Sequence, residues 1–297
     1  KRGAMSLITT RVKSSLVKQD PKKLYTKGKR LNYIFSETIF ECCSTSTDDS
    51  KKYLWHEIRQ KTKTKKRDNE FTRLFPHLKA LQPNKHILTH HYIWKDHNFI
   101  YYITDYTVMT TLKDFLVKHR KIKYKDIKSY TVQLLQALDC LHSNKPIIIF
   151  RSLQCNHVLI NEKTGCLQLS HFIESTYFDS NSSSFDSNII GSPEFLAPEM
   201  YDSDYNESVD VYSLGMSLIE MATGYYPYYE CANGPQIYKK VLSNQKPVGL
   251  QHISDSALRD FVGFCISTKD TRLDVKTLLA RSFLYAKSDN DENEYDS

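Results

Sequence analysis

The sequence predicts an α+β fold made of two unequal units, a small strand-rich unit followed by a larger helical unit. Two observations support this prediction. Between residues 24 and 106, short segments rich in β-branched and aromatic residues alternate with turn residues, which is typical of strands. After Tyr106, apolar residues recur at the three- and four-residue spacing of amphipathic helices. We therefore expect one strand-rich layer packed against a helical body.

The first unit contains three segments that we expect to be strands and one that we expect to be a helix. The strand segments are residues 37–42 (ETIFEC), 51–58 (KKYLWHEI) and 99–106 (FIYYITDY). Residues 69–81 carry a helical apolar pattern made by Phe71, Leu74, Phe75, Leu78 and Leu81. Pro76 falls inside this pattern, so we expect the helix to kink or break there.

The second unit contains three well-marked helices. Residues 127–141 and 258–266 show amphipathic spacing. The segment VDVYSLGMSLIEMATG is apolar nearly all round, so it belongs in the middle of the unit, with Gly224 as its stop. We expect a basic extension over residues 1–23 that opens with a cloning scar, the first unit over 24–106, the second over 107–286, and a disordered acidic tail over 287–297.

Composition favours a globular protein of a reducing compartment. Hydrophobic residues make up 40% of the 297 and charged residues 25%, and no apolar run approaches the roughly 20 residues of a membrane helix. The seven cysteines form no CxxC pair, which predicts free thiols and a cytoplasmic or nuclear location. The basic run KTKTKKR suits nucleic acid or anionic lipid, but no aromatic or groove-reading motif accompanies it, so we expect a solvated loop and no nucleic-acid partner.

The segment GSPEFLAPEMYDSDYNESVDVYSLGMSLIEMATG resembles the sequence after the activation loop of protein kinases. It is most similar to the with-no-lysine kinases and to their pseudokinase relatives, the nuclear receptor binding proteins. The resemblance covers residues 25–284 and is strongest in the C-terminal half. It implies a bilobal protein-kinase-like fold in which Glu199 pairs with Arg272 and Asp210 anchors the catalytic-loop backbone.

The resemblance also implies where a nucleotide would bind, and those positions have changed. The family's glycine-rich loop, which cradles phosphate, corresponds to LNYIFSETIFE, which has no glycine. His56 stands at the lysine position, and the lysine that with-no-lysine kinases relocate maps to Ser36 or Glu37. Of the other nucleotide-site positions, Leu54 replaces a small residue, and we expect neither it nor Thr104 and Leu159 to bind nucleotide. The helix glutamate of the family maps to Leu74.

The catalytic loop of the family, His-Arg-Asp-Leu-Lys-x-x-Asn, becomes FRSLQCNH at residues 150–157. Ser152 replaces the acid that orients the hydroxyl, Gln154 replaces the lysine, and His157 replaces the metal-binding asparagine. A register shift would put Asn156 there instead.

The Asp-Phe-Gly metal motif becomes HFI, with His171 in place of the acid. His157 and His171 invite a transition-metal hypothesis, but two histidines without a third ligand are more often incidental, so we expect no metal and no cofactor.

Six chemical positions have thus changed together, which predicts a catalytically inactive domain. Such a domain would act as a scaffold or allosteric regulator of a protein partner, for example an active related kinase. The alternative is an atypical serine/threonine kinase of the with-no-lysine type with a displaced nucleotide or metal site. In kinases the arginine corresponding to Arg151 often binds an activation-loop phosphate, so Ser184 and Ser187 are candidate phosphorylation sites.

Overall fold

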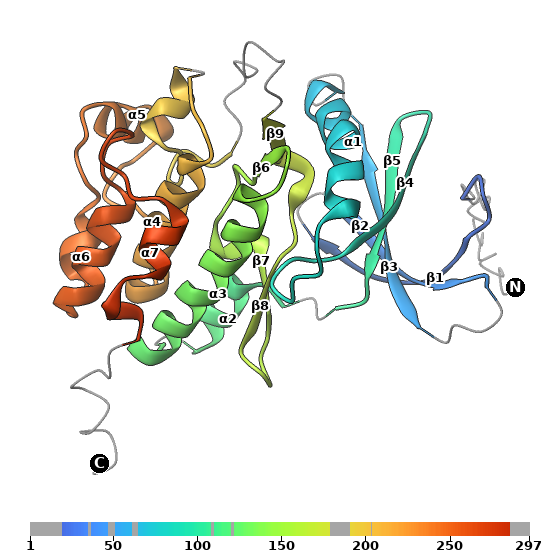
Figure 1. The fold of residues 1–297 in the computed structure, drawn as a ribbon, viewed down its shortest axis with the longest axis horizontal. Coiled ribbons are helices and arrows are strands. Elements are labelled where there is room, and N and C mark those ends of the chain that lie inside the picture. Colours follow the sequence, from blue (N-terminus) through green and yellow to red (C-terminus); the bar gives the residue numbers. More distant parts are fainter. Residues whose placement is uncertain are drawn as a thin grey trace, which may run out of the picture.

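The structure is a computed structural model, which describes residues 20–34, 37–46, 51–60, 65–107, 110–119, 122–178, 191–202 and 204–285. These residues form a strand-rich unit and a helical unit, as predicted (Figure 1). Ser36, Ser184, Ser187, residues 1–19 and the acidic tail lie outside the described residues. The predictions made for them stay predictions.

The strand-rich unit, the N-lobe, is one antiparallel sheet with the order β1-β2-β3-β5-β4. Its strands are β1 Tyr25–Ile34, β2 Glu37–Ser44, β3 Lys52–Arg59, β4 His90–Asp96 and β5 Phe99–Asp105. An aromatic cluster covers one face, with the Trp55 and Trp94 ring centroids 4.7 Å apart. The strand patterns did not identify β1 and β4, because both are rich in charged or histidine residues.

Helix α1 (Lys65–Ala80) lies beside the sheet on the side of the helical unit (Figure 1). It begins four residues before the predicted start and continues through Pro76, so the expected break is wrong. The proline removes one main-chain hydrogen bond, but Phe71, Leu74 and Phe75 are almost completely buried in the core. This burial outweighs the lost bond, since each such side chain contributes about 1.5–3 kcal/mol.

The helical unit, the C-lobe, is built around α4, which is buried along nearly its whole length as its apolar sequence predicts. At Gly215 a Cβ atom would lie 2.6 Å from Ile266 and 2.7 Å from Cys265, so only glycine allows this packing. Gly224 ends the helix with a φ of 76°. The helices are α2 Leu112–His119, α3 Tyr124–His142, α4 Ser208–Thr223, α5 Gly234–Leu242, α6 Ser256–Cys265 and α7 Val275–Leu279.

Two short antiparallel strand pairs bring the site segments together at the lobe boundary. Strand β6 (Ile147–Ile149) pairs with β9 (Thr176–Phe178), and β7 (Val158–Asn161) pairs with β8 (Cys166–Leu169). The loop between β6 and β7 therefore lies beside the loop between β8 and β9. These two loops carry Ser152, Gln154, His157 and His171.

All seven cysteines are free. None of the helices in the described part of the chain combines the length and apolar character of a membrane-spanning segment.

Candidate functional site

The loop after β6 is fixed by one buried carboxylate. Asp210, in the first turn of α4, accepts the main-chain N–H groups of Phe150 at 2.8 Å and Arg151 at 2.7 Å. His142 Nε2 lies 2.9 Å from the same side chain. Arg151 has a φ of 62°, a conformation that is uncommon outside glycine, and these two bonds hold it there.

A second buried contact joins distant parts of the C-lobe. The Arg272 guanidinium donates to both carboxylate oxygens of Glu199, with a distance of 3.1 Å from Nη2 to Oε2. Arg272 also donates to the main-chain oxygens of Ser208 and Ser267, so its charge is fully hydrogen-bonded. A bidentate pair of this kind sets orientation as well as charge.

The Arg151 side chain crosses the lobe boundary. It is almost fully buried, and its Nη2 lies 3.1 Å from Glu70 Oε2 on α1. Its Nε donates to the Glu174 main-chain oxygen at 2.6 Å, and its Nη1 donates to the Tyr205 hydroxyl at 3.1 Å. Burial alone would lower the pKa of Arg151, but Tyr205 and Glu70 raise it above its usual value. In this structure a carboxylate of the N-lobe therefore pairs with the arginine proposed to bind a loop phosphate.

His56 lies on β3, at the position that the resemblance aligns with the family's lysine, and is buried. Its Nδ1 lies 3.0 Å from Glu37 Oε2 and its Nε2 lies 2.9 Å from Thr104 Oγ1. The imidazole stacks on the Tyr102 ring with centroids 4.3 Å apart. His56 thus links strands β2, β3 and β5 through side-chain hydrogen bonds.

Glu37 is the centre of this network. It accepts a 2.6 Å hydrogen bond from the Tyr102 hydroxyl, and its Oε1 lies 3.5 Å from His171 Nδ1. Burial alone would raise the pKa of Glu37, but the hydrogen bonds and charges of His171 and His56 hold it well below the usual range. Burial, and then the Glu37 carboxylate, raise the pKa of Tyr102 well above its usual value. The buried Glu37 carboxylate, on β2, thus interacts with side chains of both lobes.

The histidines that the resemblance aligns with the family's metal-binding residues lie against each other. The ring centroids of His157 and His171 are 4.3 Å apart, and both side chains are buried. His157 Nδ1 lies 2.6 Å from the Ser152 main-chain oxygen, and its Nε2 lies 3.1 Å from Gln154 Nε2. Burial, and then the nearby His171, lower the pKa of His157 well below its usual value, so its imidazole is neutral.

Ser152 and Gln154 are both turned inward. The Ser152 hydroxyl lies 3.4 Å from the Phe150 main-chain oxygen and 3.3 Å from that of His171, so it bridges the two site loops. Gln154 is buried against His157. The side chains at the catalytic-loop positions thus bond to the loops themselves.

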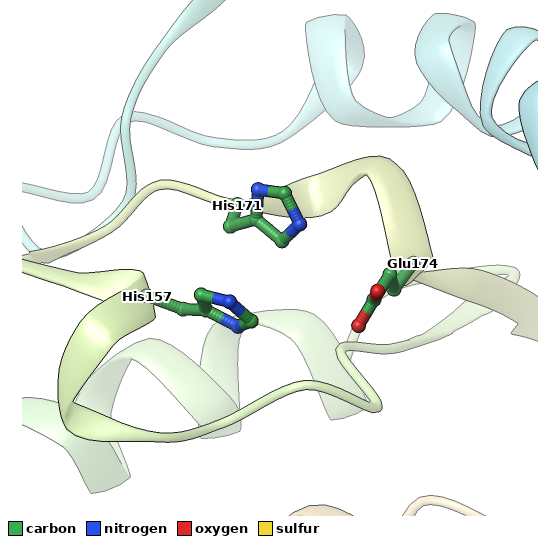
Figure 2. Close-up of side chains that lie close together, drawn as sticks. All are labelled: His157, His171 and Glu174. Atoms are coloured by element: carbon green, nitrogen blue, oxygen red, sulfur yellow. The ribbon is translucent and has the colours of Figure 1, made fainter. Parts of the chain in front are cut away.

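The structure adds a third group that the sequence analysis missed. Glu174 follows His171 by three residues and lies with both histidines, so that one possible ligand atom from each residue is within 4.8 Å of the others (Figure 2). The His-x-x-Glu spacing in HFIE was the signal that could have identified it. Glu70 and Tyr102 were missed too, because their partners are distant in sequence.

The predicted nucleotide positions are filled by side chains. Leu54 and Thr104 lie opposite each other on β3 and β5 and are completely buried, and Leu159 is buried where it pairs with Thr111. Leu74, on α1, is completely buried in the hydrophobic core.

Comparison with known proteins decides the family. Residues 36–284 match the protein kinase domain. This chain belongs to the protein kinase family. Among its relatives are serine/threonine-protein kinase WNK2 of mouse and of human and WNK3 of mouse, each 37% identical over 235 residues, or 77% of this chain. The chain spans 10–13% of the length of these relatives.

This finding corrects the expectation that the chain is not an enzyme. The chain is a kinase domain, and the relatives that match most of its length are named serine/threonine kinases. The inference from six changed positions took the loss of family residues as the loss of activity.

The magnesium ion that kinases use does not fit the residues at these positions. Mg²⁺ prefers hard oxygen ligands in an octahedral arrangement. Here two of the three candidate ligands are imidazoles, and Gln154 presents its amide nitrogen toward His157. We therefore derive no chemical step through Mg²⁺ at this site.

Proposed function

We propose that this chain is the kinase domain of an atypical serine/threonine protein kinase, similar to the with-no-lysine type, with a displaced nucleotide site. The observation that carries the proposal is the catalytic-loop frame, which Asp210 holds by two main-chain hydrogen bonds. The Phe150 and Phe172 rings, 4.9 Å apart, connect this loop to the segment that carries His171. The identity to named serine/threonine kinases supports the same proposal.

We expect ATP to bind differently here from the family pattern. Since Leu54, Thr104 and Leu159 are buried, we propose that ATP binds only after side chains move, or in a shifted pose. The phosphates would meet His56 and His171, the nitrogen-bearing side chains next to Glu37.

We expect this transfer to be slow. Ser152 has no carboxylate to orient the attacking hydroxyl, and it bonds to main-chain oxygens. Removing one group that stabilises a transition state typically costs about 10²–10³ in rate.

A role in protein contacts is a second proposal, compatible with the first. Tyr225, Tyr226 and Tyr229 form an exposed aromatic group after α4, whereas Tyr228 is buried. Tyrosine is enriched at protein interfaces. We propose that this group contacts a protein partner, for example a related kinase whose activity it regulates, and that the chain acts in the cytoplasm, where its free cysteines stay reduced.

The test of the main proposal follows the γ-phosphate. The purified chain is incubated with γ-labelled ATP and a general protein substrate such as casein, and the label on serine and threonine is located by mass spectrometry. We expect label transfer by the wild type and by the control His97→Gln, because the His97 side chain is exposed. The rate of transfer by His171→Gln should be lower by about tenfold or more.

Two outcomes contradict the proposal. One is no transfer by the folded wild type. The other is equal transfer by the wild type and His171→Gln, which would show that the transfer does not use this site.

A further inference from the structure

The group formed by His157, His171 and Glu174 has the composition of a metal site. His157 ends a short 3₁₀ turn, Cys155–His157, and Glu174 ends another, Phe172–Glu174, which begins directly after His171. Figure 2 shows the two imidazole rings facing each other with the Glu174 carboxylate beside them. One possible ligand atom from each residue lies within 4.8 Å of the other two.

Neighbouring acceptor groups determine which nitrogen of each imidazole carries the proton. A carbonyl oxygen only accepts, so the 2.6 Å contact with the Ser152 oxygen places the proton of His157 on Nδ1. Glu37 Oε1 lies 3.5 Å from His171 Nδ1, and its negative charge favours a proton on that nitrogen. Metal-binding histidines usually donate their second N–H to such a carbonyl or carboxylate, which fixes the ring and the tautomer.

The donor set selects a class of metal. Two imidazole nitrogens and one carboxylate oxygen suit borderline ions such as Zn²⁺ and Co²⁺, with positions left for water or a phosphate oxygen. One group competes with the metal, because Gln154 Nε2 lies 3.1 Å from His157 Nε2. This amide must turn away when an ion binds.

We propose that His157, His171 and Glu174 bind one divalent transition-metal ion, with Glu37 as a positioning residue that orients His171. The Glu37 and Glu174 carboxylates would balance the charge of the ion. Because Glu37 also bonds to His56 on β3, the ion would connect the N-lobe to both site loops. The proposal does not depend on phosphate transfer, since its test measures the metal alone.

The test is equilibrium dialysis of the metal-stripped chain against Zn²⁺, with bound zinc measured by mass spectrometry, and Co²⁺ titration followed by visible absorption. We expect one saturable ion per chain and a Co²⁺ spectrum without thiolate bands, because no cysteine is a ligand. His171→Gln and Glu174→Gln should abolish this binding. Glu37→Gln should weaken it by about 10- to 100-fold, as for other residues that orient a ligand.

The control is His119→Gln. His119 forms an exposed histidine–glutamate pair with Glu162, at 3.7 Å, so its loss should leave the stoichiometry unchanged. Circular dichroism shows whether each variant is folded. If His171→Gln does not fold, Glu174→Gln still tests the proposal, because it is a substitution of equal size at a partly exposed residue. The proposal is overturned if the folded wild type shows no saturable binding, or if folded Glu174→Gln binds Zn²⁺ and Co²⁺ as the wild type does.

Discussion

The C-lobe frame, meaning the buried contacts made by Asp210 and by Glu199 with Arg272, has the residue types expected of a kinase. The site that this frame supports does not. In the frame, residues of the family type form the buried contacts, as in the pair of Glu199 with Arg272 and the bonds from Asp210 to the catalytic loop. In the site, the family's charged residues are replaced, yet the new side chains are also bonded to one another. Glu37, His56 and His171 form one such buried group.

We interpret this difference as a site that has been rebuilt. Buried polar groups are costly unless they are hydrogen-bonded or paired with a charge. At the positions that the resemblance aligns with the family's lysine and metal-binding aspartate, the imidazoles of His56 and His171 both contact the Glu37 carboxylate on β2.

Removing the frame's ion pair should have the largest effect. Arg272→Ala leaves Glu199 buried without its partner, which typically lowers the free energy of unfolding by about 3–5 kcal/mol. Lys269→Ala is the matched control, because its partner Asp204 is exposed and the expected loss is at most about 1 kcal/mol. Urea denaturation measures both. Similar losses in the two variants would show that the frame does not depend on the buried pair.

Acid should expose the cost of burying His90, which packs against Phe75 and Phe172 next to the site. Burial, and then His56, lower the pKa of His90 from 6.5 to about 3. In the unfolded chain His90 is protonated below pH 6.5, whereas in the folded chain it stays neutral down to about pH 3. The free energy of unfolding therefore falls as the pH decreases from 6.5 to 3.

His90→Phe removes this proton and should flatten the dependence by up to about 1.4 kcal/mol per pH unit. Urea denaturation of both proteins at several pH values between 6.5 and 3 measures the slopes. Parallel curves for the wild type and the variant would contradict the assignment.

Glu37→Gln tests whether the rebuilt site is also a source of stability. The amide cannot satisfy the histidines and Tyr102 as a carboxylate does, so we expect a loss of about 1–3 kcal/mol. The depressed pKa of Glu37 means that its contribution is present above the ordinary value of 4.5 and is lost as the pH falls below it. The loss caused by the substitution should therefore shrink in acid.

Glu41→Gln, on the same strand with an exposed lysine partner, is the control for this experiment and should cost at most about 1 kcal/mol. A Glu37→Gln protein as stable as the wild type at neutral pH would show that the network does not stabilise the N-lobe.

Two glycines should give the smallest effects, with opposite signs. Gly224 ends α4 with a φ of 76°, so Gly224→Ala should cost about 1 kcal/mol. Gly263 lies inside α6 with open space around its Cα, so Gly263→Ala should add about 0.5–1 kcal/mol. Thermal unfolding separates them, and shifts of the same sign would contradict this account of the C-lobe.

Much of the fold could be predicted because its signals are local. The apolar run around α4, the spacing in α3 and the β-branched and aromatic residues of β3 and β5 each lie within one segment. Continuous helix through Pro76 could not be predicted, because the packing that permits it comes from distant residues.

For the site, the motif positions His56, Ser152, His157 and His171 could be located from the sequence, but their partners could not. Glu37 reaches His171 across 134 residues of chain, and Glu70 meets Arg151 only because α1 packs against the C-lobe.

The central claim is that the kinase frame is intact and that the rebuilt site sets the chemistry. The most direct measurement is γ-phosphate transfer with Mg²⁺ by a triple variant, Ser152→Asp, His157→Asn and His171→Asp, which returns the family's residue types to three positions. The account predicts a folded protein that transfers phosphate at least about 10²-fold faster than the wild type. A folded triple variant with no gain would contradict it, because the frame would then be unable to support kinase chemistry even with the family's residues in place.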